Sequence, residues 1–168
     1  MRDRHGSPSP SESPGRSGRT ATAEVDPRRV GAVDLSYRPR NDRQADPGEI
    51  VWTWVPYEEN DGRGKDRPVL VVAREAGGTL LGLPLTSKPH DRGDFVGIGS
   101  GAWDAEGRPS WVLLGRVLRV HQAGVRRAGV AVGARPFAAV SAALTSRYGW
   151  GAPRRSWLRR LAARLFAR

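Results

Sequence analysis

Two short apolar runs separated by a polar loop constrain the fold of this chain most strongly, in the sequence PGEIVWTWVPYEENDGRGKDRPVLVV over residues 47–72. In residues 49–57 the apolar or β-branched side chains alternate between both faces of an extended chain: Ile50, Trp52 and Trp54 on one face, and Val51, Thr53 and Val55 on the other. Both faces need cover, which predicts a central strand and places the two tryptophans in the core.

The second run, residues 68–73, is short and β-branched. Between the two runs, residues 57–66 are too polar and too rich in glycine for a helix or a strand. We therefore predict a hairpin with a long, mobile loop that delivers Arg67 to the edge of a small sheet.

Further strands are predicted after this hairpin. Residues 79–86 form an apolar run interrupted by Pro84, which lacks a backbone donor, so we expect this strand to end near Pro84 at an edge or bulge. Residues 95–98 predict a brief strand, and residues 110–120 predict two extended runs or one long strand kinked at Gly115. Five or six short strands joined by hairpins favour a small twisted barrel.

Helical spacing appears only after the strands. In residues 136–148 the apolar side chains recur at three- and four-residue steps, Pro136 suits a first helical turn and Gly149 suits a C-terminal cap. We expect this helix to pack on the barrel, which gives a mainly β fold of the α+β class. The last segment, residues 151–168, is compatible with a basic amphipathic helix.

The chain divides by composition into four segments. Residues 1–29 are rich in Ser, Pro and Arg and nearly lack large apolar groups, so we expect a disordered tail. Residues 30–46 are expected to form a strap or linker, residues 47–150 the barrel domain, and residues 151–168 the basic tail. Of the formal net charge of +11, residues 152–168 supply +6 with six Arg and no acid, so bulk charge says little about nucleic-acid binding by the domain.

Composition also limits the possible chemistry. The chain has no cysteine, which excludes disulfides and thiolate chemistry, and its three histidines, His5, His90 and His121, lack ligand spacing, so we expect no metal site. It has no apolar run of membrane-spanning length and no apolar N-terminal signal, which predicts a cytoplasmic location.

The order PGEIVW, KDRPVLVV, LPLTS and SWV…RVLRV, followed by a closing helix, resembles the PemK/MazF family of toxins from type II toxin–antitoxin systems, over residues 48–148. The resemblance implies an SH3-like β-barrel, a homodimer, and an mRNA interferase: a metal-independent, cofactor-free endoribonuclease that cleaves single-stranded RNA by 2′-OH attack and leaves a 2′,3′-cyclic phosphate. It also implies a cognate antitoxin with an acidic segment as partner, and operator DNA as a possible ligand of the toxin–antitoxin complex.

The resemblance assigns catalytic roles to two residues. Arg67 matches the family's arginine in the RP motif and would stabilise charge on the phosphate, a role that suits a permanently charged, bidentate guanidinium. Thr86 matches the family's hydroxyl residue and would hydrogen-bond the scissile phosphate. Arg67 could instead form a surface ion pair with Asp66, and Thr86 could simply cap its strand.

Three more residues are candidates for substrate binding. Ser87 is adjacent to Thr86 and could share its role. The loop over residues 57–66 corresponds to the family's flap over the RNA, where Arg63 and Lys65 could contact backbone phosphates.

At two positions the chain departs from the family. Leu113 and Gly115 stand where the family often has an arginine and an aspartate that assists proton transfer. General acid–base help is worth about 10²–10⁴-fold in rate, so a substitute is needed. The candidate substitutes are the following: His90, Asp91, Asp104, Glu106 and His121. We favour His90 or Asp91 as a catalytic residue, since an imidazole titrates near neutral pH.

The same departures motivate an alternative function, a catalytically weakened module that binds RNA, operator DNA or an antitoxin without cleaving. A third hypothesis concerns residues 154–168 alone, whose arginines would make weak contact with an anionic surface such as lipid or nucleic acid.

Overall fold

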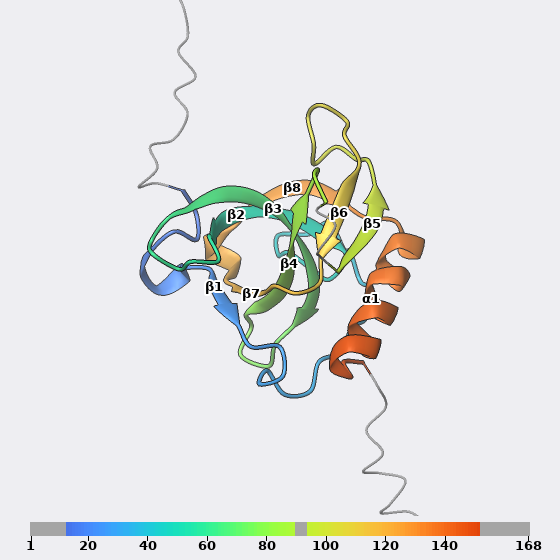
Figure 1. Cartoon of the computed structure of the whole chain (residues 1–168), viewed down its shortest axis with the longest axis horizontal. Helices are drawn as coiled ribbons and strands as arrows, with labels where there is room; N and C mark the ends of the chain where they lie inside the picture. Colours follow the sequence, from blue (N-terminus) through green and yellow to red (C-terminus); the bar gives the residue numbers. More distant parts are fainter. Residues whose placement is uncertain (1–12, 90–93, 152–168) are drawn as a thin grey trace, which may run out of the picture.

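Eight antiparallel strands followed by one α-helix form the framework of the part of the chain that the structure describes (Figure 1). The computed structural model describes residues 13–89 and 94–151. The elements are β1 (Ala23–Val25), β2 (Glu49–Pro56), β3 (Gly64–Arg74), β4 (Leu80–Thr86), β5 (Phe95–Gly99), β6 (Ser110–Leu113), β7 (Val117–Val120), β8 (Arg126–Ala131) and α1 (Ala134–Tyr148), with short 3-10 helices η2 (Gly18–Thr20) and η3 (Gln122–Gly124).

The β2–β3 hairpin has the predicted central position. β2 pairs with β3 on one side and β8 on the other. Its residues are buried along the whole of the Val51 face, whereas on the opposite face only Ile50 is buried. β3 begins at Gly64, earlier than predicted, because Lys65 pairs with Val55 and so extends the ladder into the expected loop. The expectation that Trp52 and Trp54 are core residues is wrong: both are only partly buried, since β8 covers β2 no further than Trp52.

β4 explains how a proline fits into a central strand. Its residues Leu80–Gly82 pair with β7, and Leu85 and Thr86 pair with β6. Pro84 lies between these two partners, where one neighbour ends and the other begins, so its missing N–H costs no ladder bond on that side. The strand therefore continues through Pro84 to Thr86 instead of ending there.

Of the two alternatives predicted for residues 110–120, the structure shows two separate strands. Both pair with β4, but their other neighbours differ, β5 beside β6 and β1 beside β7, because the chain turns at Gly115. β8 was not predicted, since RRAGVA lacks a strong apolar pattern. Strand pairing in the described residues runs β1-β7-β4-β3-β2-β8 and leaves β1 and β8 at the ends, so the sheet is curved but not closed.

The N-terminal segment is more ordered than its composition suggests. The prediction of disorder over residues 1–29 does not hold for residues 13–29, which contain η2 and β1, and β1 pairs antiparallel with β7. Composition misled because this segment needs no core of its own: it is held by backbone and polar contacts to the sheet. Residues 1–12 lie outside the described residues.

Two apolar clusters lie on opposite faces of the sheet, as the alternation along β3 requires. Leu70 and Val72 face the larger cluster, which includes Phe137, Val140 and Leu144 of α1. Val69 and Val71 face the smaller cluster, whose other members come from β2, β4, β7 and residue Ala45. Residues 30–35 lie across the larger cluster as a strap.

The predicted helix is present. α1 contains Pro136 in its first turn and ends at Tyr148. The capping residue Gly149 has a left-handed φ of 71°, and its N–H donates to the Thr145 carbonyl. Apart from Gly151, the predicted basic helix over residues 151–168 lies outside the described residues, so its contact with anionic surfaces stays a prediction. Within the described part of the chain, no helix is long and apolar enough to cross a membrane.

Candidate functional site

Arg67 and Thr86 lie at the same end of two paired strands. β3 and β4 run antiparallel with Val69 opposite Pro84. Continuing that register by two residues places Arg67 opposite Thr86, and the two-residue step keeps both side chains on one face of the sheet. On the other side of β3, Arg67 pairs with Thr53 of β2.

Two adjoining clefts share Arg67, Leu85, Thr86 and Lys88 as a common wall. The first, here called the loop cleft, has a volume of about 450 Å³ and is also lined by Tyr57, Arg63, Leu113 and Arg116, among others. The second, the tryptophan cleft, has a volume of about 560 Å³ and is also lined by Trp52, Lys65, Ser87, Trp103 and others. A ligand that crosses from one cleft to the other must pass Arg67 and Thr86.

Two cations of this wall, and Lys65 beside it, form no ion pair with a carboxylate of the described residues. Arg67, Lys65 and Lys88 take part in none of the ion pairs found among the described residues. Asp66, the neighbour that could have paired with Arg67, pairs instead with Arg126 of β8. The surface ion pair considered from the sequence is therefore not formed.

Burial and neighbouring positive charges lower the pKa values of two of these cations. Burial lowers the pKa of the Arg67 guanidinium below its usual value, and the positive charge of Arg116 adds to the lowering against an opposite effect of Tyr57. The pKa of Lys65 is also lowered, first by the charge of Arg67, then by burial and by Lys88. An anion bound here would relieve this repulsion, so the geometry suits a phosphate.

The Thr86 hydroxyl forms two hydrogen bonds with the backbone of a local turn. It accepts a hydrogen bond of 3.1 Å from the backbone N–H of Lys88 and donates one of 3.3 Å to the Lys88 carbonyl. The cap that the sequence offered as an alternative role is thus formed. Its donated bond is long and exposed, so the same proton can turn toward a ligand oxygen. Ser87 lines only the tryptophan cleft.

The two basic residues assigned to the flap separate in space. Arg63 lines the loop cleft, where it bonds to Asp61 at 2.7 Å and lies 5.9 Å from the ring centre of Tyr57. Lys65 lines the tryptophan cleft from within β3. The two clefts therefore each receive one of these basic side chains.

The candidates for proton transfer fall into three groups. His90 and Asp91 lie outside the described residues. Asp104 and Glu106 line the tryptophan cleft, where Arg108 pairs with both at 3.0 and 3.2 Å. His121 lines neither cleft, and its charge acts on Glu75 at the other end of β3.

Sequence reasoning missed two basic residues that line the two clefts. Arg116 lines the loop cleft just before β7, and Lys88 follows Ser87 directly and lines both clefts. A charged residue between the apolar Leu114 and Val117 was the only signal for Arg116. Within the described ranges, no group of three or more His, Asp or Glu is placed to hold a metal ion.

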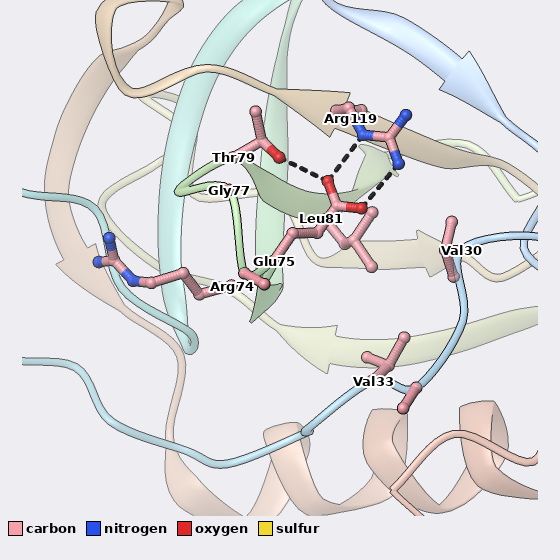
Figure 2. Close-up of a pocket in the computed structure, with 10 residues that line it drawn as sticks. Val30, Val33, Arg74, Glu75, Gly77, Thr79, Leu81 and Arg119 are labelled. Atoms are coloured by element: carbon pink, nitrogen blue, oxygen red, sulfur yellow. Dashed lines mark hydrogen bonds and ion pairs between the residues drawn. The ribbon is translucent and has the colours of Figure 1, made fainter.

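A third cleft, the Glu75 cleft, differs from the other two because its central charge is paired (Figure 2). It has a volume of about 400 Å³ and lies between the turn after β3 and the strap residues Val30 and Val33. Its carboxylate, Glu75, accepts two hydrogen bonds of 2.7 Å from Arg119 and one of 2.6 Å from Thr79. These bonds, led by that from Arg119, hold the pKa of Glu75 below its usual value.

The chain matches one protein family and is similar to solved structures that include two from Deinococcus radiodurans. Residues 46–147, more than half of the chain, match the family described as the PemK-like, MazF-like toxin of type II toxin–antitoxin systems. A MazE–MazF crystal structure (Form II) from Deinococcus radiodurans is 23% identical, with a TM-score of 0.48 over 64% of this chain and 98% of that chain. MazF (Form I) from the same organism is 22% identical, with a TM-score of 0.49 over 64% and 99%. No curated protein sequence matches the chain.

Proposed function

Because the chain belongs to the PemK-like, MazF-like toxin family of type II toxin–antitoxin systems, we propose that it is an endoribonuclease that cleaves single-stranded RNA. The observation that carries this proposal is the shared wall of the loop and tryptophan clefts. There Arg67 and Thr86 lie together, and Arg67, Lys88 and the neighbouring Lys65 have no carboxylate partner among the described residues. A strand that occupied both clefts would lay its phosphate on this wall.

In the proposed reaction the ribose 2′-hydroxyl attacks the adjacent phosphorus. The bond from O2′ to phosphorus forms as O2′ gives up its proton, the bond from phosphorus to O5′ breaks as O5′ takes up a proton from water, and a 2′,3′-cyclic phosphate and a 5′-hydroxyl result. Arg67 would contact two phosphate oxygens and stabilise their growing charge, and Thr86 would donate to one of them. The sequence assigns the proton transfer from O2′ to His90 or Asp91, which stays a prediction.

RNA contacts beyond the reacting phosphate follow from the same clefts. Arg63 in the loop cleft and Lys65 in the tryptophan cleft would hold flanking phosphates on opposite sides of Arg67, and Ser87 would add a hydroxyl in the tryptophan cleft. Trp52 presents a half-buried ring in the tryptophan cleft, where a base could stack.

The test is cleavage of RNA by the purified full chain in buffer that contains a chelator of divalent metals. We expect discrete fragments with 2′,3′-cyclic phosphate ends from the wild type and none from Arg67→Ala. Intact RNA after incubation with the wild type would overturn the proposal, as would undiminished cleavage by Arg67→Ala.

A second candidate function rests on Leu113, an uncharged side chain that lines the loop cleft. It favours a module that binds RNA or operator DNA without cutting. Retarded migration of RNA with no new fragments would support this function over the first.

Family membership also supports two proposed partners, a second copy of the chain and an antitoxin with an acidic segment. An acidic segment would be attracted to the unpaired cations of the shared wall and would exclude RNA from it. Sedimentation of the purified chain tests the dimer. Co-expression with the product of a short neighbouring reading frame, followed by co-purification, tests the antitoxin.

A further inference from the structure

Residues 13–25 lie outside the family-matched range, yet they complete the sheet (Figure 1). β1 pairs with β7, from Ala23 opposite Arg119 to Val25 opposite Val117. On β2, pairing with β8 ends at Trp52, and the N–H of Trp54 donates instead to the Pro14 carbonyl at 2.9 Å. The N-terminal segment therefore spans the opening between β2 and β7.

The fit of this segment is close. Gly15 has a φ of 79°, and a Cβ placed on it would lie 2.1 Å from the Thr53 hydroxyl, so only glycine is accommodated. That hydroxyl is buried and bonds to Thr22 at 2.7 Å and to the Gly124 carbonyl at 2.8 Å. Thr53 is the cross-strand partner of Arg67, so the segment is anchored beside the candidate site.

The same segment holds one guanidinium of the loop cleft. Glu24 of β1 accepts hydrogen bonds from Nε and Nη2 of Arg116 at 3.0 and 2.6 Å, and Nη2 also donates to the Pro56 carbonyl at 2.8 Å. The Arg116 side chain is 11% exposed. Among the described residues no acceptor bonds to its Nη1, so the guanidinium is fixed by one edge and keeps donors for a ligand in the cleft.

The bonds from Arg116 to Glu24 oppose an electrostatic repulsion between Arg116 and Arg67. The pKa of Arg67 is lowered first by burial, and the charge of Arg116 contributes as well, so the two guanidinium groups repel each other. A carboxylate behind Arg116 offsets that repulsion and reduces the number of rotamers the side chain can adopt.

We propose that Glu24 is a positioning residue that holds Arg116 against the loop cleft for contact with an RNA phosphate, so that the N-terminal segment is part of the binding site. This inference rests on the proposed function and adds a residue from outside the family-matched range. Arg116 touches the substrate, and Glu24 acts only through Arg116.

The test is a double-mutant cycle of Glu24→Gln and Arg116→Ala in the full chain. The probe is a random-sequence single-stranded RNA with 2′-O-methyl groups, which lacks the attacking hydroxyl, and affinity is read by fluorescence anisotropy. We expect each single variant to weaken binding about tenfold and the double variant to bind no more weakly than Arg116→Ala alone. The matched control is Glu75→Gln, which breaks a similar ion pair to Arg119 of β7, three residues after Arg116, and should leave affinity unchanged.

Thermal unfolding of each variant separates positioning from folding. A structural role for Glu24 would lower the melting temperature and give additive losses in the double variant. Either unchanged affinity in Glu24→Gln or additive losses would overturn the proposal. Tighter binding would also overturn it, because Glu24 would then mask the cation rather than orient it.

The same variants distinguish this inference from the proposed function. If the wild type binds the methylated RNA with the expected cycle but does not cleave ordinary RNA, the nuclease proposal fails and the positioning role stands. If the wild type cleaves RNA and Glu24→Gln matches it in kcat/KM and affinity, only the positioning role fails. Absence of binding by the wild type overturns both.

Discussion

Charged side chains lie at both ends of β3, but they are paired with an opposite charge at one end only. Near its start, Arg67 stands with Lys65 and Lys88, and none of the three has a carboxylate partner among the described residues. Directly after its other end, Glu75 is bonded to Arg119 and to Thr79 at 2.6–2.7 Å (Figure 2). The ends are separated by roughly 25 Å of extended chain.

Paired charges stabilise the fold, whereas cations without a carboxylate partner are available to bind an anion. At the Glu75 cleft the carboxylate of Glu75 is paired with Arg119, and this ion pair joins the turn after β3 to the neighbouring strand β7. Around the shared wall, burial is the first cause that lowers the pKa of Arg67, with a further contribution from the charge of Arg116, and the charge of Arg67 is the first cause that lowers the pKa of Lys65, so these cations are both desolvated and mutually repelled. A protein retains such repulsion at a cost in stability, and an anionic ligand removes that cost on binding. We expect substitutions at the two ends to have opposite consequences.

The largest effect is expected for Arg67→Ala. It should lower kcat/KM for RNA cleavage about 10²- to 10³-fold, since it removes the donor that meets the developing phosphate charge, with no loss in melting temperature. Arg119→Ala is the matched control and should do the reverse, lowering the melting temperature and leaving the cleavage rate intact. Equal rates of RNA cleavage by the two variants would contradict the assignment of binding to one end of β3 and stability to the other.

Thr86→Val is expected to have a smaller effect. The hydroxyl is a single neutral donor that is shared with a local turn, so its loss should cost about tenfold in cleavage rate. Thr79→Val removes a hydroxyl of the same type that serves Glu75, and its cleavage rate should equal that of the wild type. A slow Thr79→Val variant would show that the two ends are coupled.

Glu75→Gln should affect stability with a definite pH dependence. The pKa of Glu75 is lowered in the folded chain, first by its bond from Arg119, so the stabilisation exists above the unfolded pKa and is lost as pH falls through the folded value. We expect the variant to be about 1 kcal/mol less stable at neutral pH, since the partly exposed pair is screened by solvent. Chemical denaturation should show the difference vanishing in acid. A difference that persists there would mean that the carboxylate's charge is not its cause.

The smallest expected effect concerns salt. Each phosphate contact made by Lys65 or Lys88 should contribute about 0.7 to the slope of log affinity against log salt concentration. Lys65→Ala and Lys88→Ala should each reduce the slope by that amount in an anisotropy titration. Arg74→Ala, whose guanidinium is paired with Asp46 at 2.8 Å beside the Glu75 cleft, should leave the slope unchanged.

Where the sequence has strong local patterns, it predicts the fold well. The β2–β3 hairpin and α1 follow from two-residue and three-to-four-residue spacing of apolar side chains, and the family follows from four short motifs. β1 and β8 could not be predicted because their residues gain their strand structure from neighbours distant in the chain, as Ala23 does from Arg119.

The part of the candidate site that lies in local motifs was predictable, and the part that depends on long-range contacts was not. Arg67 and Thr86 belong to motifs, and the strand register brings them together. The place of Arg116 depends on Glu24, 92 residues earlier, and no pattern within either segment indicates that pair. Pro84 likewise suggested the end of a strand, since a change of partner along β4 cannot be read from the sequence of β4 alone.

The most direct test of the whole account is a crystal structure of the full chain with an RNA whose cleaved nucleotide, mapped from the reaction products, carries a 2′-deoxy sugar. The account predicts that the phosphate after that nucleotide lies within hydrogen-bond distance of both the Arg67 guanidinium and the Thr86 hydroxyl, with flanking nucleotides in the loop and tryptophan clefts. A phosphate bound elsewhere, with Arg67 and Thr86 both free of contact, would contradict it.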